Sequence, residues 1–131
     1  MFLLVLAVSI AFGHSFEPST RQAPVHAELG VGDSFRLPGR ALSIIFVRVV
    51  SDSRCPKGVT CVWEGDAIVA VRVIADAVEP ETLELHTGDM SRREGTAHGV
   101  RVHLDRLEPL PTADRPLAAG DYRAFLSVFI E

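Results

Sequence analysis

From residue 25 onward, apolar and polar residues alternate with a period of two almost everywhere in the chain. This period is that of an extended strand with one buried face and one exposed face. The segments that we expect to form strands are, in chain order, Val25–Leu29, Ser34–Leu37, Leu42–Val50, Asp66–Ala75, Glu81–Thr87, Gly99–Arg106 and Asp121–Ile130. Turn residues such as Pro38-Gly39 separate them, and no long amphipathic helix is predicted.

Seven short strands with one buried face each are expected to pack as two sheets, and 131 residues leave room for one domain. We therefore expect an all-β fold, an immunoglobulin-like antiparallel β-sandwich of about seven strands, in residues 25–131. The segment Leu117–Ala124 resembles the entry into a late strand of immunoglobulin-like folds. In those folds a tyrosine ties its hydroxyl back to the backbone at this point, and Tyr122 is the only tyrosine of the chain.

The N-terminal residues are typical of an export signal. Phe2–Phe12 is an apolar run that is too short to cross a bilayer, which needs about 20 residues, but suits a signal peptide. Small residues at its end fit cleavage after Gly13 or Ser15. No Lys or Arg precedes the run, so an apolar first strand of the domain remains the alternative. We expect a signal peptide at 1–15, a flexible linker at 16–24 and a periplasmic or extracellular protein.

The two cysteines are close together, with five residues between Cys55 and Cys61. Pro56 and Gly58 let the chain reverse between them, and such a pair in an exported chain predicts one small disulfide ring. Redox pairs have two residues between the cysteines, and zinc sites add further Cys or His ligands at shorter spacing. Closing so small a ring stabilises a fold by only about 2 kcal/mol, so the bond is expected to shape one loop.

The residues around this ring are the candidate binding surface. In an extended chain Cys61 and Trp63 lie on the same side, so the indole can pack on the disulfide. Arg54 can lie over the indole or pair with Asp52. We expect Arg54, Lys57 and Trp63 to be the contacts to test first, while Trp63 is equally well placed to be a core residue.

The run from Asp52 to Gly65 follows the pattern D-S-R-C-P-x-G-x-x-C-x-W-x-G. This pattern resembles a signature of small bacterial exported proteins and lipoproteins that have no assigned biochemical function. The likeness extends to Leu42–Val50, to Asp66–Ala75 and to the turn at Leu37–Gly39. The resemblance implies a compact cell-envelope or extracellular β domain, and it brings no catalytic residues. No cysteine follows the apolar N-terminal run, which departs from the lipoprotein members.

The net charge of −4, with both signs interspersed, argues against binding of nucleic acid and against electrostatic binding to a membrane. Ser53 and Ser127 lack the G-x-S-x-G context of a nucleophile, and no phosphate-binding or calcium motif is present. His86 and His103 are predicted on exposed strand faces, where a solvated histidine is usual. We therefore expect no enzymatic activity and no cofactor, with His86, His98 and His103 as candidates for a weak metal site.

These observations favour a monomeric, non-catalytic secreted or cell-envelope module that binds an unknown protein or glycan. Its candidate surfaces are the disulfide ring and the polar loop Gly88–His98, because loops at the ends of a sandwich carry recognition. One alternative is a protease inhibitor that presents the disulfide-closed loop 55–61, with Lys57 in a trypsin-like pocket. A weak copper- or zinc-binding envelope protein and a scaffold domain without a ligand are the others.

Overall fold

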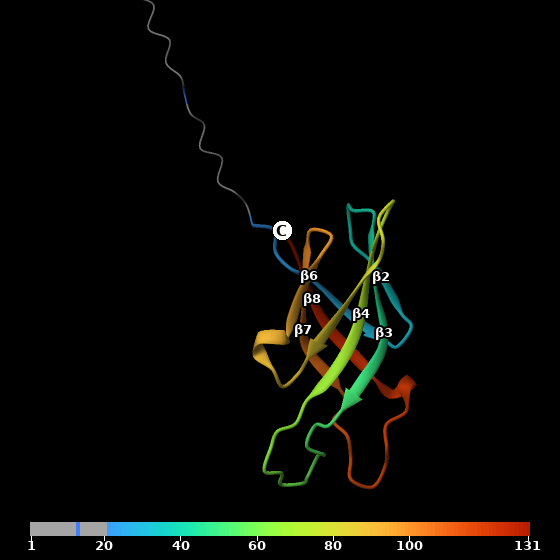
Figure 1. Cartoon of the computed structure of the whole chain (residues 1–131), viewed down its shortest axis with the longest axis vertical. Helices are drawn as coiled ribbons and strands as arrows, with labels where there is room; N and C mark the ends of the chain where they lie inside the picture. The colour runs from blue at the N-terminus through green and yellow to red at the C-terminus, as the bar shows by residue number, and fades with distance from the viewer. Residues whose placement is uncertain (1–12, 14–20) are drawn as a thin grey trace, which may run out of the picture.

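Two antiparallel sheets of four strands form the domain in the computed structural model, which describes Gly13 and residues 21–131 (Figure 1). The rest of the predicted signal peptide, and residues 16–20 of the predicted linker, lie outside the described residues. The strands are β1 (Val25–Gly30), β2 (Ser34–Arg36), β3 (Leu42–Asp52), β4 (Ala67–Ala75), β5 (Glu81–His86), β6 (Glu94–Ala97), β7 (Val100–Glu108) and β8 (Arg123–Ile130). Two short 3-10 helices, η1 (Met90–Arg92) and η2 (Ala119–Asp121), precede β6 and β8. No helix within the described residues is long and apolar enough to cross a membrane.

Neighbouring strands in each sheet are mostly consecutive in the chain. The first sheet has the order β1-β8-β7-β6, and the second has the order β2-β3-β4-β5. The chain therefore passes from one sheet to the other after β1 and returns after β5. Figure 1 shows the two layers, with β6, β7 and β8 in one and β2, β3 and β4 in the other. The predicted all-β class with two packed antiparallel sheets is confirmed.

Residues 21–131 form eight strands, not the predicted seven. The additional strand is β6, which lies inside Gly88–His98, the segment expected to be a loop. Only one of its four residues is buried, so it carries no alternating pattern. It forms because it pairs with β7 and because Gly95 leaves space for a neighbour, since a Cβ on Gly95 would lie 3.1 Å from a methyl carbon of Leu83.

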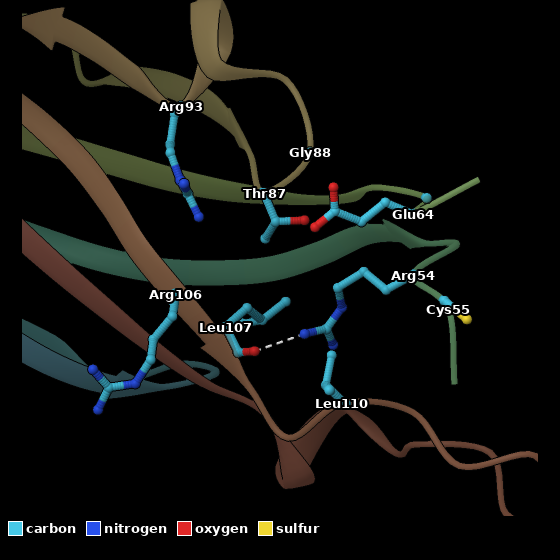
Figure 2. Close-up of a pocket in the computed structure, with 10 residues that line it drawn as sticks. Arg54, Cys55, Glu64, Thr87, Gly88, Arg93, Arg106, Leu107 and Leu110 are labelled. Carbon is cyan, nitrogen blue, oxygen red and sulfur yellow. Dashed lines mark hydrogen bonds between the residues drawn. The ribbon is translucent and has the colours of Figure 1, made fainter. Parts of the chain in front are cut away.

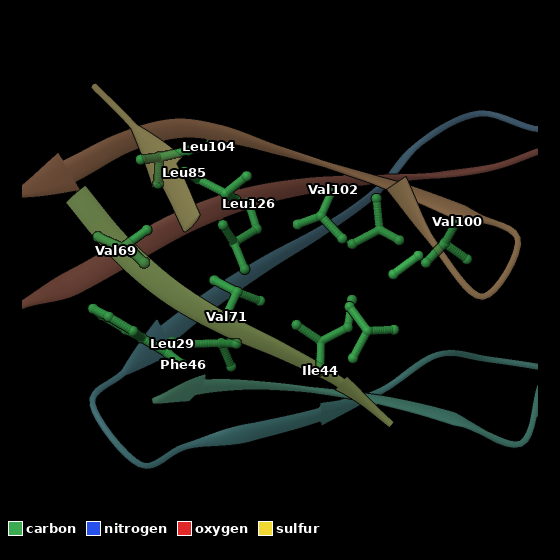
Figure 3. Close-up of a cluster of buried hydrophobic side chains, with 14 of the residues drawn as sticks. Leu29, Ile44, Phe46, Val69, Val71, Leu85, Val100, Val102, Leu104 and Leu126 are labelled. Atoms are coloured by element: carbon green, nitrogen blue, oxygen red, sulfur yellow. The ribbon is translucent and has the colours of Figure 1, made fainter. Parts of the chain in front are cut away.

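The core lies between the two sheets, where the alternating pattern places it. Val100, Val102 and Leu104 of β7 are buried, while Arg101 and His103 on the opposite face are partly exposed. Both sheets contribute large side chains that are almost completely buried (Figure 3): Leu37, Ile44, Phe46, Val69, Val71, Val73, Leu85, Val100, Val102, Leu104, Leu126 and Val128. Burial of these side chains is the main stabilising contribution to the fold. The candidate binding residues lie outside this core.

Strands β3 and β7 run past their predicted ends, to Asp52 and to Glu108. The register of β3 is irregular at two places, between Phe46 and Arg48 and between Val49 and Ser51, and that of β7 is irregular at Asp105. Bulges of this kind bend a strand and change the direction of its side chains. Asp52 is the last residue of β3 and does not belong to the following loop. Its place at the end of the strand determines which groups its carboxylate can contact.

Three backbone segments meet closely where the chain returns from β3 to β4. Gly65 has a φ of +77°, and a Cβ on it would overlap the carbonyl oxygen of Ser53. Gly88 in turn lies against the carbonyl oxygen of Gly65, which a Cβ on Gly88 would overlap. Glycine is required at both positions because no side chain fits between these segments.

Gly65→Ala should lower the free energy of unfolding by about 3 kcal/mol or more. An L-residue with left-handed backbone costs about 1–2 kcal/mol, and the overlap with Ser53 adds about 1–3 kcal/mol. Gly58→Ala is the matched control, because Gly58 has a φ of +78° but no atom within 4 Å of an added Cβ. Urea unfolding of both variants checks this, and equal losses would show that the close contact at Gly65 has no energetic role.

Candidate functional site

The loop of residues 53–65, here named the ring loop, leaves the end of β3 and returns to β4. Cys55 and Cys61 are joined by a disulfide, with their Cα atoms 5.9 Å apart, so the predicted bond is confirmed. Between them the chain makes a tight turn, in which the N–H of Val59 donates to the carbonyl of Pro56 at 3.1 Å. The ring is therefore small and closed both by a covalent bond and by a hydrogen bond.

Backbone hydrogen bonds fix the ring loop to the rest of the domain. The N–H of Cys55 donates to the carbonyl of Glu64 at 3.0 Å, which pairs the two sides of the stem. The N–H of Lys57 donates to the carbonyl of Pro111 at 2.8 Å, which ties the ring to the chain between β7 and β8. The loop is thus held at its stem and at the ring.

Arg54 extends from the stem into the protein and is buried, with 9% of the residue exposed. Its Nε and Nη2 each donate to one carboxylate oxygen of Asp52, both at 2.8 Å. Its Nη1 donates to the carbonyl of Leu107 at 2.6 Å (Figure 2), and Nη2 also donates to the carbonyl of Pro109 at 2.8 Å. A buried guanidinium requires such partners, because an unpaired buried charge is very costly. Arg54 therefore joins the end of β3 to the end of β7.

Asp52 also accepts a hydrogen bond from the Tyr122 hydroxyl at 3.0 Å. The predicted bond from this hydroxyl to the backbone is therefore wrong, because the buried carboxylate of Asp52 is the stronger acceptor. Burial alone would raise the pKa of Asp52, but the hydrogen bonds and charge of Arg54, with the Tyr122 hydroxyl, hold it below 3.8. Burial and the hydrogen bond to Asp52 raise the pKa of Tyr122 to about 12.

The other candidate contacts lie on the surface of the ring loop. Val62 and Trp63 are 92% and 82% exposed, and Lys57 is exposed as well. Of the two environments considered for Trp63, the structure shows the surface and not the core. Of the two partners considered for Arg54, it shows Asp52 and not the indole. Burial of Arg54 leaves Lys57 and Trp63 as the predicted contacts that a partner can reach.

The three histidines considered as metal ligands lie apart. His86 ends β5 in the second sheet, His103 lies on β7 in the first sheet, and His98 lies in the turn between β6 and β7. His86 is buried rather than exposed as predicted, because its Nδ1 lies 2.6 Å from the carboxylate of Asp66. Over Gly13 and residues 21–131, no group of three or more His, Cys, Asp or Glu side chains is arranged to hold a metal ion.

A polar cluster on the outer face of the first sheet escapes sequence reasoning. Ser127 donates to one carboxylate oxygen of Asp105 at 2.7 Å, and its Oγ lies 3.0 Å from Nδ1 of His26. Nδ1 of His103 lies 2.9 Å from the other oxygen of Asp105. The alternating pattern puts His103 and Asp105 on one face, but only the pairing of β1, β8 and β7 adds the other two. Ser127 is buried, and its hydroxyl joins His26 of β1 to Asp105 of β7.

A cleft of about 320 Å³ lies beside the stem of the ring loop (Figure 2). Glu64 lines it from the stem, and Thr87 lines it from the end of β5. Arg93 lines it from the segment after η1, and Leu107 and Leu110 supply apolar surface. Glu64 directly follows the exposed Trp63 in the chain.

Comparison of the chain with protein-family models, with curated proteins and with solved structures found no match. The resemblance of the Asp52–Gly65 pattern to small bacterial exported proteins therefore stays a prediction. The function has to be argued from the geometry of the ring loop and the cleft.

Removal of either charged partner of the buried ion pair should be strongly destabilising. Arg54→Ala leaves the buried carboxylate of Asp52 without its cation and should lower the free energy of unfolding by about 3–5 kcal/mol. Tyr122→Phe removes one hydrogen bond to a charged group and should cost about 1.5–3 kcal/mol. Arg72→Ala, at an exposed residue of β4, is the control and should change stability by less than about 0.5 kcal/mol. Urea unfolding at neutral pH measures all three, and a loss at Arg54 as small as at Arg72 would contradict the role assigned to the ion pair.

Stability should fall in acid. The pKa values of Asp52 and Asp66 are lowered from 3.8 in the folded protein. A carboxyl group of this kind binds a proton more readily in the unfolded chain, so its stabilisation is present above pH 3.8 and is lost as the pH falls through the folded pKa. Urea unfolding at a series of pH values checks this. Asp52→Asn should be less stable at neutral pH and should show a shallower decline in acid, and a decline as steep as in the native protein would exclude Asp52 as a cause.

Proposed function

We propose that this chain is an exported, non-catalytic binding domain whose ring loop contacts a partner protein. The observation that carries this proposal is the exposure of Val62 and Trp63, adjacent apolar side chains that are 92% and 82% exposed. Large adjacent apolar side chains that are exposed on a loop mark a surface that another molecule covers. Tryptophan is also among the residues that contribute most to the affinity of protein interfaces.

The fixed base of the ring loop supports this proposal. The Cys55–Cys61 disulfide closes the ring, the Lys57–Pro111 hydrogen bond holds it from the side, and Arg54 anchors the stem. A loop that is ordered before binding loses less conformational entropy when a partner docks. The ring loop is therefore suited to recognition without a change of shape.

A protein partner is favoured over a glycan. Val59 and Val62 expose aliphatic side chains on the same loop as the exposed indole of Trp63. Aliphatic and aromatic side chains complement the apolar centre of a protein interface. The hydroxyl groups of a sugar would instead lose hydrogen bonds to water against these valines without regaining them.

The disulfide supports an exported location, because such bonds persist outside the reducing cytosol. A signal peptide at residues 1–15, release to the periplasm or the medium, and a monomeric state complete this part of the proposal. The immunoglobulin-like character is proposed in one respect, namely that loops at the ends of two packed sheets carry recognition. The likeness to small bacterial exported proteins is consistent with such a module.

The alternatives receive less support from the geometry. Lys57 lies in the tight turn after Pro56, and its N–H is bonded to the carbonyl of Pro111. An inhibitor loop that enters a protease cleft would present extended backbone with free N–H and C=O groups. The copper or zinc alternative relied on His86, His98 and His103, which lie apart.

Trp63→Ser combined with Val62→Ser should abolish retention of the partner while changing the free energy of unfolding by less than about 1 kcal/mol, because both side chains are exposed. Val78→Ser is the matched control, since Val78 is also an exposed valine, 52% exposed, between β4 and β5. The measurement is retention of cell-envelope proteins on immobilised native and variant protein, with near-UV circular dichroism as the test of folding.

A protein retained by native and Val78→Ser material but not by the double variant would identify the partner. Equal retention by all three would exclude the ring loop as the contact. Cys55→Ser with Cys61→Ser should keep the fold and weaken retention, because it removes the constraint on the loop without removing the exposed side chains.

A further inference from the structure

The cleft beside the ring loop holds one cation that the fold orients but does not neutralise. Arg93 is half-buried, and its Nε donates to the carbonyl of Leu104 at 3.1 Å. Its Nη2 donates to the carbonyl of Asp105 at 3.4 Å, and its Nη1 lies 3.5 Å from the sulfur of Met90. Among the described residues its guanidinium forms no ion pair, so its charge is not balanced by a neighbouring carboxylate. The carbonyls fix the direction of the side chain and leave further N–H groups without a protein partner.

The other arginines around the cleft are already satisfied. Arg54 donates to both oxygens of Asp52 and to two carbonyls. Arg106 donates to Glu108 at 2.9 Å and lies over the ring of Phe125 at 3.6 Å. Figure 2 shows Arg106 directed away from Glu64, whereas Arg93 extends toward Thr87. Arg93 is therefore the cation of the cleft that is able to bind an anion.

We propose that the cleft receives an acidic side chain of the partner protein and that Arg93 binds its carboxylate. This inference rests on the proposed function, because Glu64, which lines the cleft, directly follows the exposed Trp63 in the chain. Arginine binds carboxylates with its planar, multiply donating guanidinium, and the apolar surface of Leu107 and Leu110 suits the methylene groups or a neighbouring apolar residue of the same segment. The volume of about 320 Å³ accommodates one side chain with part of its backbone.

Glu64 makes the site selective for a single negative charge. It lies on the opposite side of the cleft from Arg93 (Figure 2) and forms no ion pair or side-chain hydrogen bond within the described residues. A dianion such as a phosphate would be repelled by Glu64 more strongly than a carboxylate, with only one free cation to compensate. Arg93 and Glu64 should therefore act on the affinity for an acidic ligand with opposite signs.

The probe is the capped peptide acetyl-Leu-Glu-Leu-amide, with acetyl-Leu-Gln-Leu-amide as the uncharged control, titrated into the ¹⁵N-labelled protein and followed by NMR. The amides of Thr87, Gly88 and Glu64 should shift with the glutamate peptide and not with the glutamine peptide. Arg93→Gln should weaken binding by about tenfold or more, the loss expected for a charge-assisted hydrogen bond. Glu64→Gln should strengthen binding about two- to fivefold, as expected when an exposed like charge is removed. Arg72→Gln, at an exposed arginine remote from the cleft in sequence, should have no effect.

The Glu64→Gln variant keeps this test decisive. Glu64→Gln removes no hydrogen bond of the fold, so the expected gain in affinity is measurable even if Arg93→Gln is unstable. Equal binding of the two peptides, or no shift at the cleft amides, or unchanged affinity in Glu64→Gln would overturn the inference. Each of these results would leave the proposed function standing, because retention of the partner through Trp63 is measured separately.

Discussion

The buried ion pair between Arg54 and Asp52 is the constraint on which the ring loop and its proposed binding surface depend. A guanidinium removed from water must find acceptors for its donors, and Arg54 finds them in Asp52, Leu107 and Pro109. These acceptors belong to the end of β3, the end of β7 and the chain that follows it. One side chain thereby joins the two sheets at the end from which the ring loop extends. Its position in the chain, next to Cys55, fixes the stem of that loop relative to the core.

This arrangement places the residues that stabilise the loop within a few positions of the residues that we propose for recognition. The side chains that hold the loop, Arg54 and Asp52, are buried, and those of Val62 and Trp63 on the same loop are exposed. A ring as small as that of Cys55 and Cys61 adds little to global stability, since the unfolded chain loses little entropy when it is closed. The effect of the disulfide is local, because it restricts the conformations available to the ring loop. Substitutions of Val62 and Trp63 are therefore expected to alter the proposed binding with little effect on the fold.

The sequence predicts strands where the alternation is long, as in β7, because one face of such a strand must be buried. It misses β6, whose four residues depend on pairing with β7 and on the contact between Gly95 and Leu83. It also predicts the disulfide, which is a local matter of spacing and compartment. The environments of the candidate contacts, in contrast to the disulfide, depend on residues that are distant in the chain. The partners of Arg54 at Leu107 and Pro109 lie more than fifty residues away in the chain, and only strand register brings them together. For the same reason the contact of the Tyr122 hydroxyl with Asp52 could not be derived.

Arg54 and Arg93 show how one residue type acquires two roles in the same cleft. Both guanidinium groups are held by backbone carbonyls, so both have fixed directions. Only Arg54 also has a carboxylate partner, Asp52, whose pKa is lowered despite burial because Arg54 donates hydrogen bonds to it and lends it a positive charge. Arg54 therefore has no capacity left for a ligand and acts within the fold, whereas Arg93 lines the cleft with a charge that no ion pair among the described residues balances. The difference arises from which strand ends reach each side chain, and charge balance, rather than exposure alone, is the basis on which Arg93 is proposed as a binding residue.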